Sequence, residues 1–363
     1  MRMSHQTPST ASLDPEVWVI GGGVVGLMTA YALVRAGRRV GVCDAGDFCQ
    51  ESSWSGGGIL CPVPPWKYGD WAEQHVAQSC RLLGQWVPEL EALSGVSCQY
   101  RKSGLLLSGD PTHTDFLADS KPWRMTTRTR FEEGVRGDFE PGLPDPHWPA
   151  LHLPDVSQIR NPRLGQALVG ALSRLGVALK PSCPIDRLHL IGDGGIEIQS
   201  LQGEVWTAPQ VVLAAGAWTD QVLRQSGLDP LGIRPRRGQI LMYRLNVSDA
   251  PKHIINTGEG YLIPRADGQV LVGSTLEDVG FEYAPTQQAH TQLRQFAERT
   301  WPALTPERMV YQWTGHRPGL DDEKPALGCL YPHWPGLWVN AGHFRNGLGL
   351  APACAEKITQ EMM

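Results

Sequence analysis

The chain has 363 residues, of which 41% are hydrophobic and 19% are charged, as is typical of a globular protein with a sizeable core. A formal net charge of −5 excludes the overall basic character that draws proteins to nucleic acid or to anionic membranes. The eight cysteines form no C-x-x-C pair, so they predict neither a metal site nor a disulfide framework and favour a reducing compartment.

Residues 1–13 are polar and lack the apolar segment of a signal peptide, so we expect a disordered leader. The longest apolar stretch belongs to a glycine-rich turn, so we expect no transmembrane span. These features predict a cytoplasmic protein with no membrane or nucleic-acid partner. The sequence leaves the oligomeric state open, a homo-oligomer included.

The first regular elements form a βαβ unit. The apolar run Val17–Ile20 predicts a strand, Leu27–Ala36 a helix, and Arg39–Cys43 a second strand. Between the first strand and the helix stands GGGVVG, which contains the G-x-G-x-x-G spacing of dinucleotide-binding turns. The unit therefore predicts a site for a cofactor that carries phosphate.

The residues of this turn have separate physical roles. Gly21 permits the tight turn, Gly23 lets the backbone approach a pyrophosphate, and Gly26 lets the helix pack closely on the strand. The unpaired N–H groups at the helix N-terminus favour phosphate. Asp44, 21 residues after Gly23, stands where a carboxylate binds the adenosine ribose, and it would repel a 2′-phosphate. NAD and FAD both fit this pattern.

The next part of the chain is less regular. Residues 51–71 are rich in Gly and Pro and predict a loop, and apolar spacing then predicts one long helix or two over Trp71–Leu93. Gly104–Ser108 reads as a strand, and the proline-rich section Pro111–Pro154 reads as irregular.

Helices and strands alternate in the second half. Helices are predicted at Asn161–Leu175 and Gln287–Arg299. A β-rich block is predicted at Gln239–Ser274, with a hairpin at Asp267–Gly268. Further strands are predicted at Ala178–Leu179, Ile185–Leu190, Gly195–Leu201 and Val211–Ala214.

A second strand, glycine loop and helix close the chain within LWVNAGHFRNGLGLAPACAEKITQEM. An NAD enzyme has no need of such a unit so far from the first, because its two mononucleotide halves usually follow one another. In a flavoprotein, a helix N-terminus directed at the pyrimidine end of the ring would stabilise the negative charge that develops on reduction. This segment favours FAD.

Six segments together carry a family resemblance. They are the glycine turn with Asp44, SSWSGGGIL at 52–60, VVLAAGAW at 211–218, GYLIPR at 260–265, GHRPGL at 315–320 and GHFRNGLGLAP at 342–352. In this order they resemble the FAD-dependent D-amino acid oxidase family, and most closely its glycine oxidases of thiamine biosynthesis. The resemblance spans nearly the whole chain.

The resemblance implies roles for individual residues. Arg317 matches the arginine that grips the substrate carboxylate, Tyr261 a tyrosine that helps to hold it, and Arg345 the loop over the flavin ring. No metal site is expected, and Cys329 does not match the covalent flavin linkage of related oxidases, so FAD should be non-covalent. The expected cofactor-binding residues are Gly21, Gly23, Gly26, Asp44, Ser52, Ser53, Gly57, Ile185, Ala215, Trp218, His343, Arg345, Asn346 and Gly347.

The fold class expected is α/β, with a Rossmann-like FAD-binding domain and an antiparallel-sheet α+β substrate domain, both discontinuous in sequence. The FAD-binding domain should comprise residues 14–83, 151–228 and 314–363. The substrate domain should comprise residues 84–150 and 229–313.

The function implied is oxidative deamination of glycine or of small N-substituted or D-amino acids. Hydride passes to FAD, and dioxygen then accepts the electrons to give hydrogen peroxide. The nearest alternative is a sarcosine-type N-alkylglycine oxidase or a dehydrogenase that avoids oxygen. A flavin-dependent tRNA-modification module is disfavoured by the acidic charge balance, and a flavoprotein without catalysis by the presence of both Arg317 and Tyr261.

Overall fold

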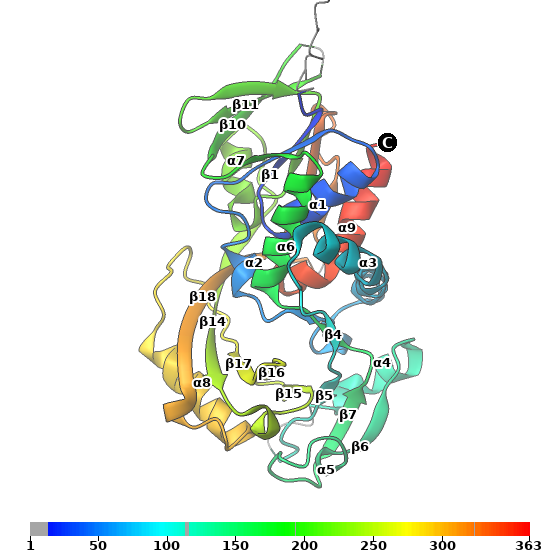
Figure 1. Cartoon of the computed structure of the whole chain (residues 1–363), viewed down its shortest axis with the longest axis vertical. Helices are drawn as coiled ribbons and strands as arrows, with labels where there is room; N and C mark the ends of the chain where they lie inside the picture. Colours follow the sequence, from blue (N-terminus) through cyan, green and yellow to red (C-terminus); the bar gives the residue numbers. More distant parts are fainter. Residues whose placement is uncertain (1–13, 113–115, 193, 323) are drawn as a thin grey trace, which may run out of the picture.

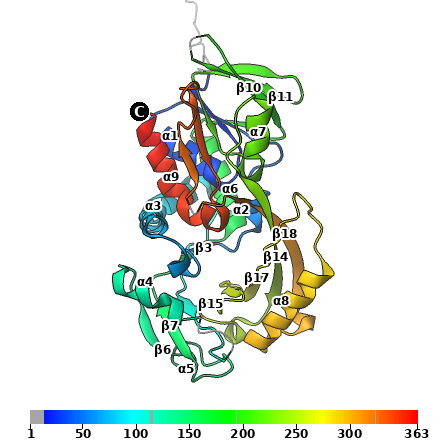
Figure 2. The same cartoon turned by 180° about the vertical axis from the view of Figure 1, so that it is seen from behind.

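The computed structural model describes residues 14–112, 116–192, 194–322 and 324–363, so the expected leader at 1–13 lies outside the described residues. Two lobes lie one above the other (Figures 1 and 2). The upper lobe holds both ends of the described chain, and the lower lobe is built mainly from its middle.

The upper lobe is centred on a mixed, mainly parallel sheet with the strand order β19-β20-β13-β1-β2-β9. All neighbouring strands are parallel except the edge pair β19 and β20. The strands are β1 (Val17–Ile20), β2 (Val40–Cys43), β9 (Ala178–Lys180), β13 (Gln210–Leu213), β19 (Ala326–Gly328) and β20 (Leu337–Ala341). Segments far apart in sequence therefore meet in one sheet, as a discontinuous domain requires.

Both faces of this sheet are covered, because its strands are apolar on both sides. Val17 and Val19 face one core, which they share with α1 (Val24–Arg35), α3 (Asp70–Ser94), α6 (Asn161–Arg174) and α9 (Gly347–Glu361). Trp18 and Ile20 face another core, formed with β10 (Ile185–Leu190), β11 (Ile196–Ser200), β12 (Val205–Ala208) and α7 (Thr219–Gln225). The turn that follows β1 is thereby held between two packed layers.

The lower lobe is centred on a largely antiparallel sheet with the order β18-β14-β17-β16-β15-β5-β7-β6, in which β15 and β5 pair in parallel. Helix α8 (Gln287–Thr300) packs on one face, where Leu293 and Phe296 join the core. The strands are β5 (Leu105–Leu107), β6 (Glu132–Val135), β7 (Pro149–Leu153), β14 (Arg234–Arg244), β15 (Ile254–Asn256), β16 (Tyr261–Pro264), β17 (Gln269–Gly273) and β18 (Met309–Gly319).

Short elements lie between the lobes. The strands β3 (Ile59–Leu60), β4 (Arg101–Lys102) and β8 (Ser157–Gln158) form a small sheet, and the helix α2 (Ser52–Ser55) contacts the upper end of β18. The Trp313 indole of β18 donates a hydrogen bond to the Ser55 carbonyl at 3.0 Å. This contact holds α2 against the lower sheet, and α2 lies between the lobes (Figure 1).

The predicted fold class is confirmed, but the local predictions missed several elements, including the strands β12, β18 and β19. The loop at 51–71 contains α2, β3 and a 3₁₀ turn at Pro65–Lys67. The section 111–154, predicted as irregular, contains β6, β7 and the helices α4 (Lys121–Thr126) and α5 (Arg136–Phe139). These elements are short, and β6 is a partly exposed edge strand, so they carry little apolar periodicity.

Two strands run across the expected domain boundaries: β7 spans residue 151 and β18 spans residue 314, and both belong to the lower sheet. The division into domains stays a prediction. Helix α3 is one continuous helix although Pro88 lies inside it. In the part of the chain that the structure describes, no helix combines the length and apolarity that crossing a bilayer needs.

Candidate active site

A cavity of about 1020 Å³ lies at the carboxyl ends of the upper parallel strands and extends down to the lower sheet. Its upper wall includes Gly21 after β1, Ala214 after β13 and Gly342 after β20. Open parallel sheets bind ligands at this edge, where the loops diverge. The volume lies at the upper end of the range of about 300–1,000 Å³ for cofactor sites, so a dinucleotide fits.

The glycine turn is built as its spacing predicts. Gly21 has a φ of +105°, and an added Cβ there would lie 2.3 Å from the Ala214 carbonyl oxygen. A Cβ on Gly26 would lie 1.8 Å from the Gly21 carbonyl oxygen, so this residue permits the close contact of α1 with the turn. Gly23 lines the cavity at the N-terminus of α1.

The N-terminus of α1 lines the cavity. Its N-cap is Gly23, which has no side chain to cap the helix. Ser53 on α2 accepts a hydrogen bond from the Val24 amide at 2.8 Å. Val25 lines the cavity at the next position, where a helix N-terminus presents N–H groups and partial positive charge to an anion. This arrangement suits a pyrophosphate.

Asp44 lines the same part of the cavity and also holds the turn in place. Its carboxylate accepts hydrogen bonds from the Gly22 amide at 2.6 Å and the Gly46 amide at 2.9 Å. Burial raises the pKa of Asp44 from its ordinary value, and the two amides act in the opposite direction. A carboxylate has further lone pairs, so ribose hydroxyls can still donate to it.

Three buried polar atoms lie unpaired beside the cavity among the described residues, and Asn161 Oδ1 is one of them. Neither Asn340 Oδ1 nor His343 Nε2 has a hydrogen-bond partner in the described ranges, and both residues line the cavity wall. Burial lowers the pKa of His343 to about 4, so its imidazole is neutral at ordinary pH. Neutral donors and acceptors of this kind can form hydrogen bonds with a polar, largely uncharged ring system.

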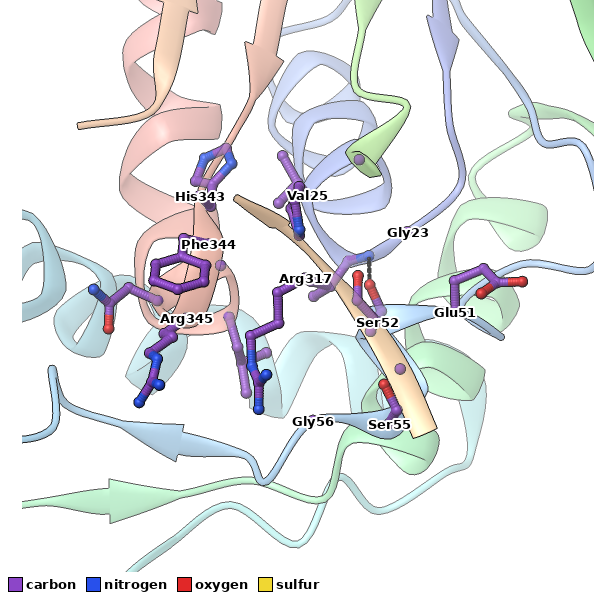
Figure 3. Close-up of a pocket in the computed structure, with 18 of the residues that line it drawn as sticks. Gly23, Val25, Glu51, Ser52, Ser55, Gly56, Arg317, His343, Phe344 and Arg345 are labelled. Atoms are coloured by element: carbon purple, nitrogen blue, oxygen red, sulfur yellow. Dashed lines mark hydrogen bonds between the residues drawn. The ribbon is translucent and has the colours of Figure 1, made fainter. Parts of the chain in front are cut away.

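The opposite end of the cavity contains Arg317, on β18. Its Nη2 donates to Ser274 Oγ at 2.7 Å and its Nη1 to the Thr275 carbonyl at 3.3 Å, both of which are uncharged acceptors. Burial lowers the pKa of Arg317 most, while the neighbouring Tyr261 raises it and the neighbouring Arg345 lowers it. Arg317 and Arg345 extend toward the same part of the pocket (Figure 3). A cationic site for a small anion results.

The structure thus brings nearly all of the predicted site residues into one cavity. Gly26 instead serves in packing, as described above. The predicted residues that line the cavity are Gly21, Gly23, Asp44, Ser52, Ser53, Gly57, Ile185, Ala215, Trp218, Tyr261, Arg317, His343, Arg345, Asn346 and Gly347. Their individual roles toward cofactor and substrate stay predictions.

A family model described as "DAO: FAD dependent oxidoreductase" matches residues 16–361. The chain belongs to this family. Its cofactor is therefore FAD, as predicted, and the donors around Gly23 and α1 fit that group.

Individual relatives agree with this assignment. The chain is 35% identical over 351 residues to a glycine oxidase from Pseudomonas putida, covering 96% of this chain and 94% of that protein. It is 31% identical to a bifunctional protein ThiO/ThiG from Trichormus variabilis, covering 94% of this chain and 52% of that protein. The crystal structure of glycine oxidase from Geobacillus kaustophilus superposes with a TM-score of 0.88 at 24% identity, covering 96% and 95% of the two chains.

Sequence reasoning missed the residues of this FAD-dependent oxidoreductase that hold the 52–58 loop. The Asn161 side chain donates to the Ser53 carbonyl at 2.9 Å. Arg265 donates to the carbonyls of Gly57 at 2.9 Å and Ile159 at 3.2 Å, and burial lowers its pKa to about 10. Arg265 is the last residue of the GYLIPR motif, so the motif itself pointed to this residue. Its role could not be predicted because its hydrogen-bond partners lie more than 100 residues away in the sequence.

Other residues around the FAD cavity also went unpredicted. Lys67, Tyr68, Asn256 and Glu259 line it from segments without a recognisable pattern. Cys329 is exposed, which is in keeping with a non-covalent cofactor, although the linkage itself stays a prediction. Across the described ranges, no three His, Cys, Asp or Glu side chains are placed to hold a metal ion.

Proposed function

We propose that this FAD-dependent oxidoreductase oxidises glycine and small N-substituted or D-amino acids, releasing hydrogen peroxide. The observation that carries the proposal is Arg317, a guanidinium on the cavity wall with neutral protein partners. A cation in this setting is poised for an anion from outside the protein. The 35% identity to a glycine oxidase supports the same assignment.

The arginine suits the carboxylate that all these substrates share. Its planar fork can donate two parallel hydrogen bonds to a carboxylate and thereby fix the plane of that group. Ser274 and the Thr275 carbonyl hold the guanidinium from behind, so its orientation is set before substrate binds. The neighbouring Tyr261 hydroxyl can hold the same carboxylate from a second direction.

Orientation of the α-carbon is the main contribution of these residues. When bound, FAD supplies the two-electron acceptor that takes hydride from the α-carbon and passes the electrons to dioxygen. The net reaction for glycine consumes one dioxygen and one water and yields glyoxylate, ammonia and hydrogen peroxide. With the carboxylate fixed by Arg317, the α-carbon is restricted to one face of the cavity, which lowers the entropic part of the barrier.

The test is Arg317→Met, which keeps the bulk of the side chain and removes its fork. We expect kcat/KM for glycine to fall by at least roughly 100-fold, about 2.7 kcal/mol, with FAD content unchanged. Arg317→Lys should recover part of the loss, because a point charge does not impose a plane. Peroxide release from glycine, sarcosine, N-ethylglycine and D-amino acids is the measurement.

Simple amines without a carboxylate are the control substrates, and their slow turnover should barely change in Arg317→Met. An equal loss with both kinds of substrate would show that Arg317 supports the fold or the cofactor. Substrate-dependent reduction without peroxide release would identify a dehydrogenase instead.

A further inference from the structure

Two of the groups that hold Arg317 come from one short segment of the lower lobe. Residues 274–277 follow β17 and continue beside β14. This segment supplies the Ser274 hydroxyl and the Thr275 carbonyl that accept hydrogen bonds from the guanidinium. Ser274 lines the cavity, and Thr275 is buried. The orientation of Arg317 therefore depends on what fixes the backbone of this segment.

The segment forms a β-bulge against β14. Ile240 pairs with Gly273 at the end of β17, and Arg237 forms a bridge with Glu277. Between these two pairs, the segment contains one residue more than β14 contains. Bulges of this kind redirect the groups of the longer strand and are common beside active sites. The extra residue thus lies in the stretch that contacts the guanidinium.

Within the bulge, the Thr275 hydroxyl takes the place of a backbone carbonyl. Arg237 and Glu277 exchange two backbone hydrogen bonds, at 3.0 and 2.9 Å. Hydrogen-bonded pairs recur every two residues in an antiparallel ladder, so the next such pair is Gln239 with Thr275. The Thr275 amide donates to the Gln239 carbonyl at 3.4 Å, but the Gln239 amide donates to Thr275 Oγ1 at 3.0 Å. The Thr275 carbonyl is left to accept from Arg317.

Glu277 holds the Thr275 hydroxyl in this role. Its Oε1 accepts hydrogen bonds from Thr275 Oγ1 at 2.6 Å and from the Gln239 side chain at 2.9 Å. Since the hydroxyl proton points to Glu277, a lone pair of the same oxygen remains for the Gln239 amide. The buried Arg237 donates to Glu277 Oε2 at 2.5 Å. Burial raises the pKa of Glu277, but the hydrogen bonds to its carboxylate outweigh burial and lower the pKa overall.

We propose that Thr275 and Glu277 are positioning residues: Glu277 orients the Thr275 hydroxyl, and that hydroxyl keeps the Thr275 carbonyl on Arg317. The inference rests on the proposed function. Neither side chain belongs to the cavity wall in the described part of the chain, so both act by setting the plane of the guanidinium before a carboxylate binds. Without the hydroxyl, the Gln239 amide would turn to the Thr275 carbonyl, as in a regular ladder, and Arg317 would lose that acceptor.

The main test is Thr275→Val, which keeps the shape of the side chain and removes its hydroxyl. In the holoenzyme we expect kcat/KM for glycine to fall by at least about 10-fold, because the plane of the guanidinium is no longer fixed. FAD content and the turnover of simple amines without a carboxylate should change little. Thr275→Ser restores the hydroxyl and should recover most of the loss. No loss, or an equal loss with both kinds of substrate, would overturn the inference.

Glu277→Gln tests the second link. Both ends of the carboxylate face donors, so an amide group must present its N–H to one of them. We expect kcat/KM for glycine to fall by at least about 3-fold. The matched control is Asp278→Asn, which removes the same charge one residue later, from an exposed pair with Arg236 at 2.7 Å, and should keep the wild-type value. Equal losses in the two variants would overturn the role of Glu277.

A binding measurement separates this inference from the proposed reaction. Methoxyacetate has a carboxylate but no amine, so its effect on the flavin absorbance reports the Arg317 site without turnover. Its Kd should rise at least about 10-fold in Thr275→Val. If glycine is oxidised but neither kcat/KM nor this Kd depends on Thr275, the inference is wrong and the proposed function stands. If the Kd depends on Thr275 but no amine releases peroxide, the proposed reaction fails while the positioning role stands.

Discussion

Gly238 shows how closely the surroundings of Arg317 are packed at the level of single residues. It lies on β14 opposite Gly315 of β18, and an added Cβ would lie 2.1 Å from the Arg317 Nη1 atom. The guanidinium thus lies flat against a strand backbone that has no side chain at this position. The orientation of Arg317 therefore depends on the absence of a side chain at Gly238.

Gly238→Ala should therefore displace the Arg317 guanidinium while the fold persists. The atoms nearest to the added Cβ belong to the flexible Arg317 side chain and not to the backbone, so they can move. We expect kcat/KM for glycine to fall by at least about 10-fold with FAD content retained. Gly84→Ala is the control, since an added Cβ in α3 meets open space among the described residues. Wild-type kinetics in Gly238→Ala would show that Arg317 does not need its present position.

Asp44→Ala removes the acceptor for two amides of the glycine turn as well as the expected partner of the ribose. Losing a hydrogen-bonded charged group costs about 1.5–3 kcal/mol, which corresponds to a Kd for FAD that is roughly 10- to 100-fold higher. Asp44→Asn keeps one acceptor oxygen, so its Kd for FAD should lie between those of the wild type and Asp44→Ala. Fluorescence titration of the apoprotein with FAD gives the Kd, and an unchanged value would exclude a role in cofactor binding.

At the level of elements, the junction of β20 and α9 is sensitive to protonation. His343 lies between β20 and the 3₁₀ turn Phe344–Asn346 and is buried with its Nε2 unpaired among the described residues. Burial lowers its pKa to about 4. In the unfolded chain the same ring has an ordinary pKa near 6.5. Between these values the unfolded chain binds a proton that the folded chain does not, so acid favours unfolding.

The free energy of unfolding should therefore decrease as the pH falls from about 6.5 to about 4, by about 3 kcal/mol from this group alone. His343→Asn lacks the titrating group. The difference in free energy of unfolding between wild type and variant should therefore narrow as the pH falls across this range. Denaturant unfolding at a series of pH values measures both. If the free energies of unfolding of the two proteins change with pH in parallel, groups other than His343 cause the pH dependence.

The elements that sequence predicts best are those whose pattern is local. The β1–turn–α1 unit follows from four apolar residues and three spaced glycines, all within 20 residues. By contrast, β6 and β7 are short strands that pair with each other across an intervening segment, so little in their own residues specifies them. Arg265 could be read as part of a motif, but its role on the Gly57 carbonyl exists only once the chain has folded.

At the scale of the whole molecule, the cofactor cavity is enclosed by parts of both lobes. The upper sheet contributes the glycine turn, and the lower sheet contributes Tyr261 and Arg317. Under the proposed function, FAD binds beside the glycine turn and the substrate binds at the end of the cavity that contains Arg317. The relative position of the two sheets is part of the site.

The purified protein should be yellow, and acid precipitation should release intact FAD into the supernatant. The reasons are the family assignment and the exposed position of Cys329, away from the residues that line the cavity. Chromatography and the absorbance spectrum of the supernatant are the measurements. Flavin that stays with the precipitate would contradict non-covalent binding.

The order of strands in the upper sheet also has a consequence for biosynthesis. Strand β20 and helix α9 come from the end of the chain, yet β20 pairs with β13 and α9 packs in the core that contains β1 and α1. A nascent chain from which β20 and α9 have not yet emerged can form the glycine turn but lacks one side of the layer that supports it. The layer that supports the glycine turn is therefore complete only when β20 and α9 have docked.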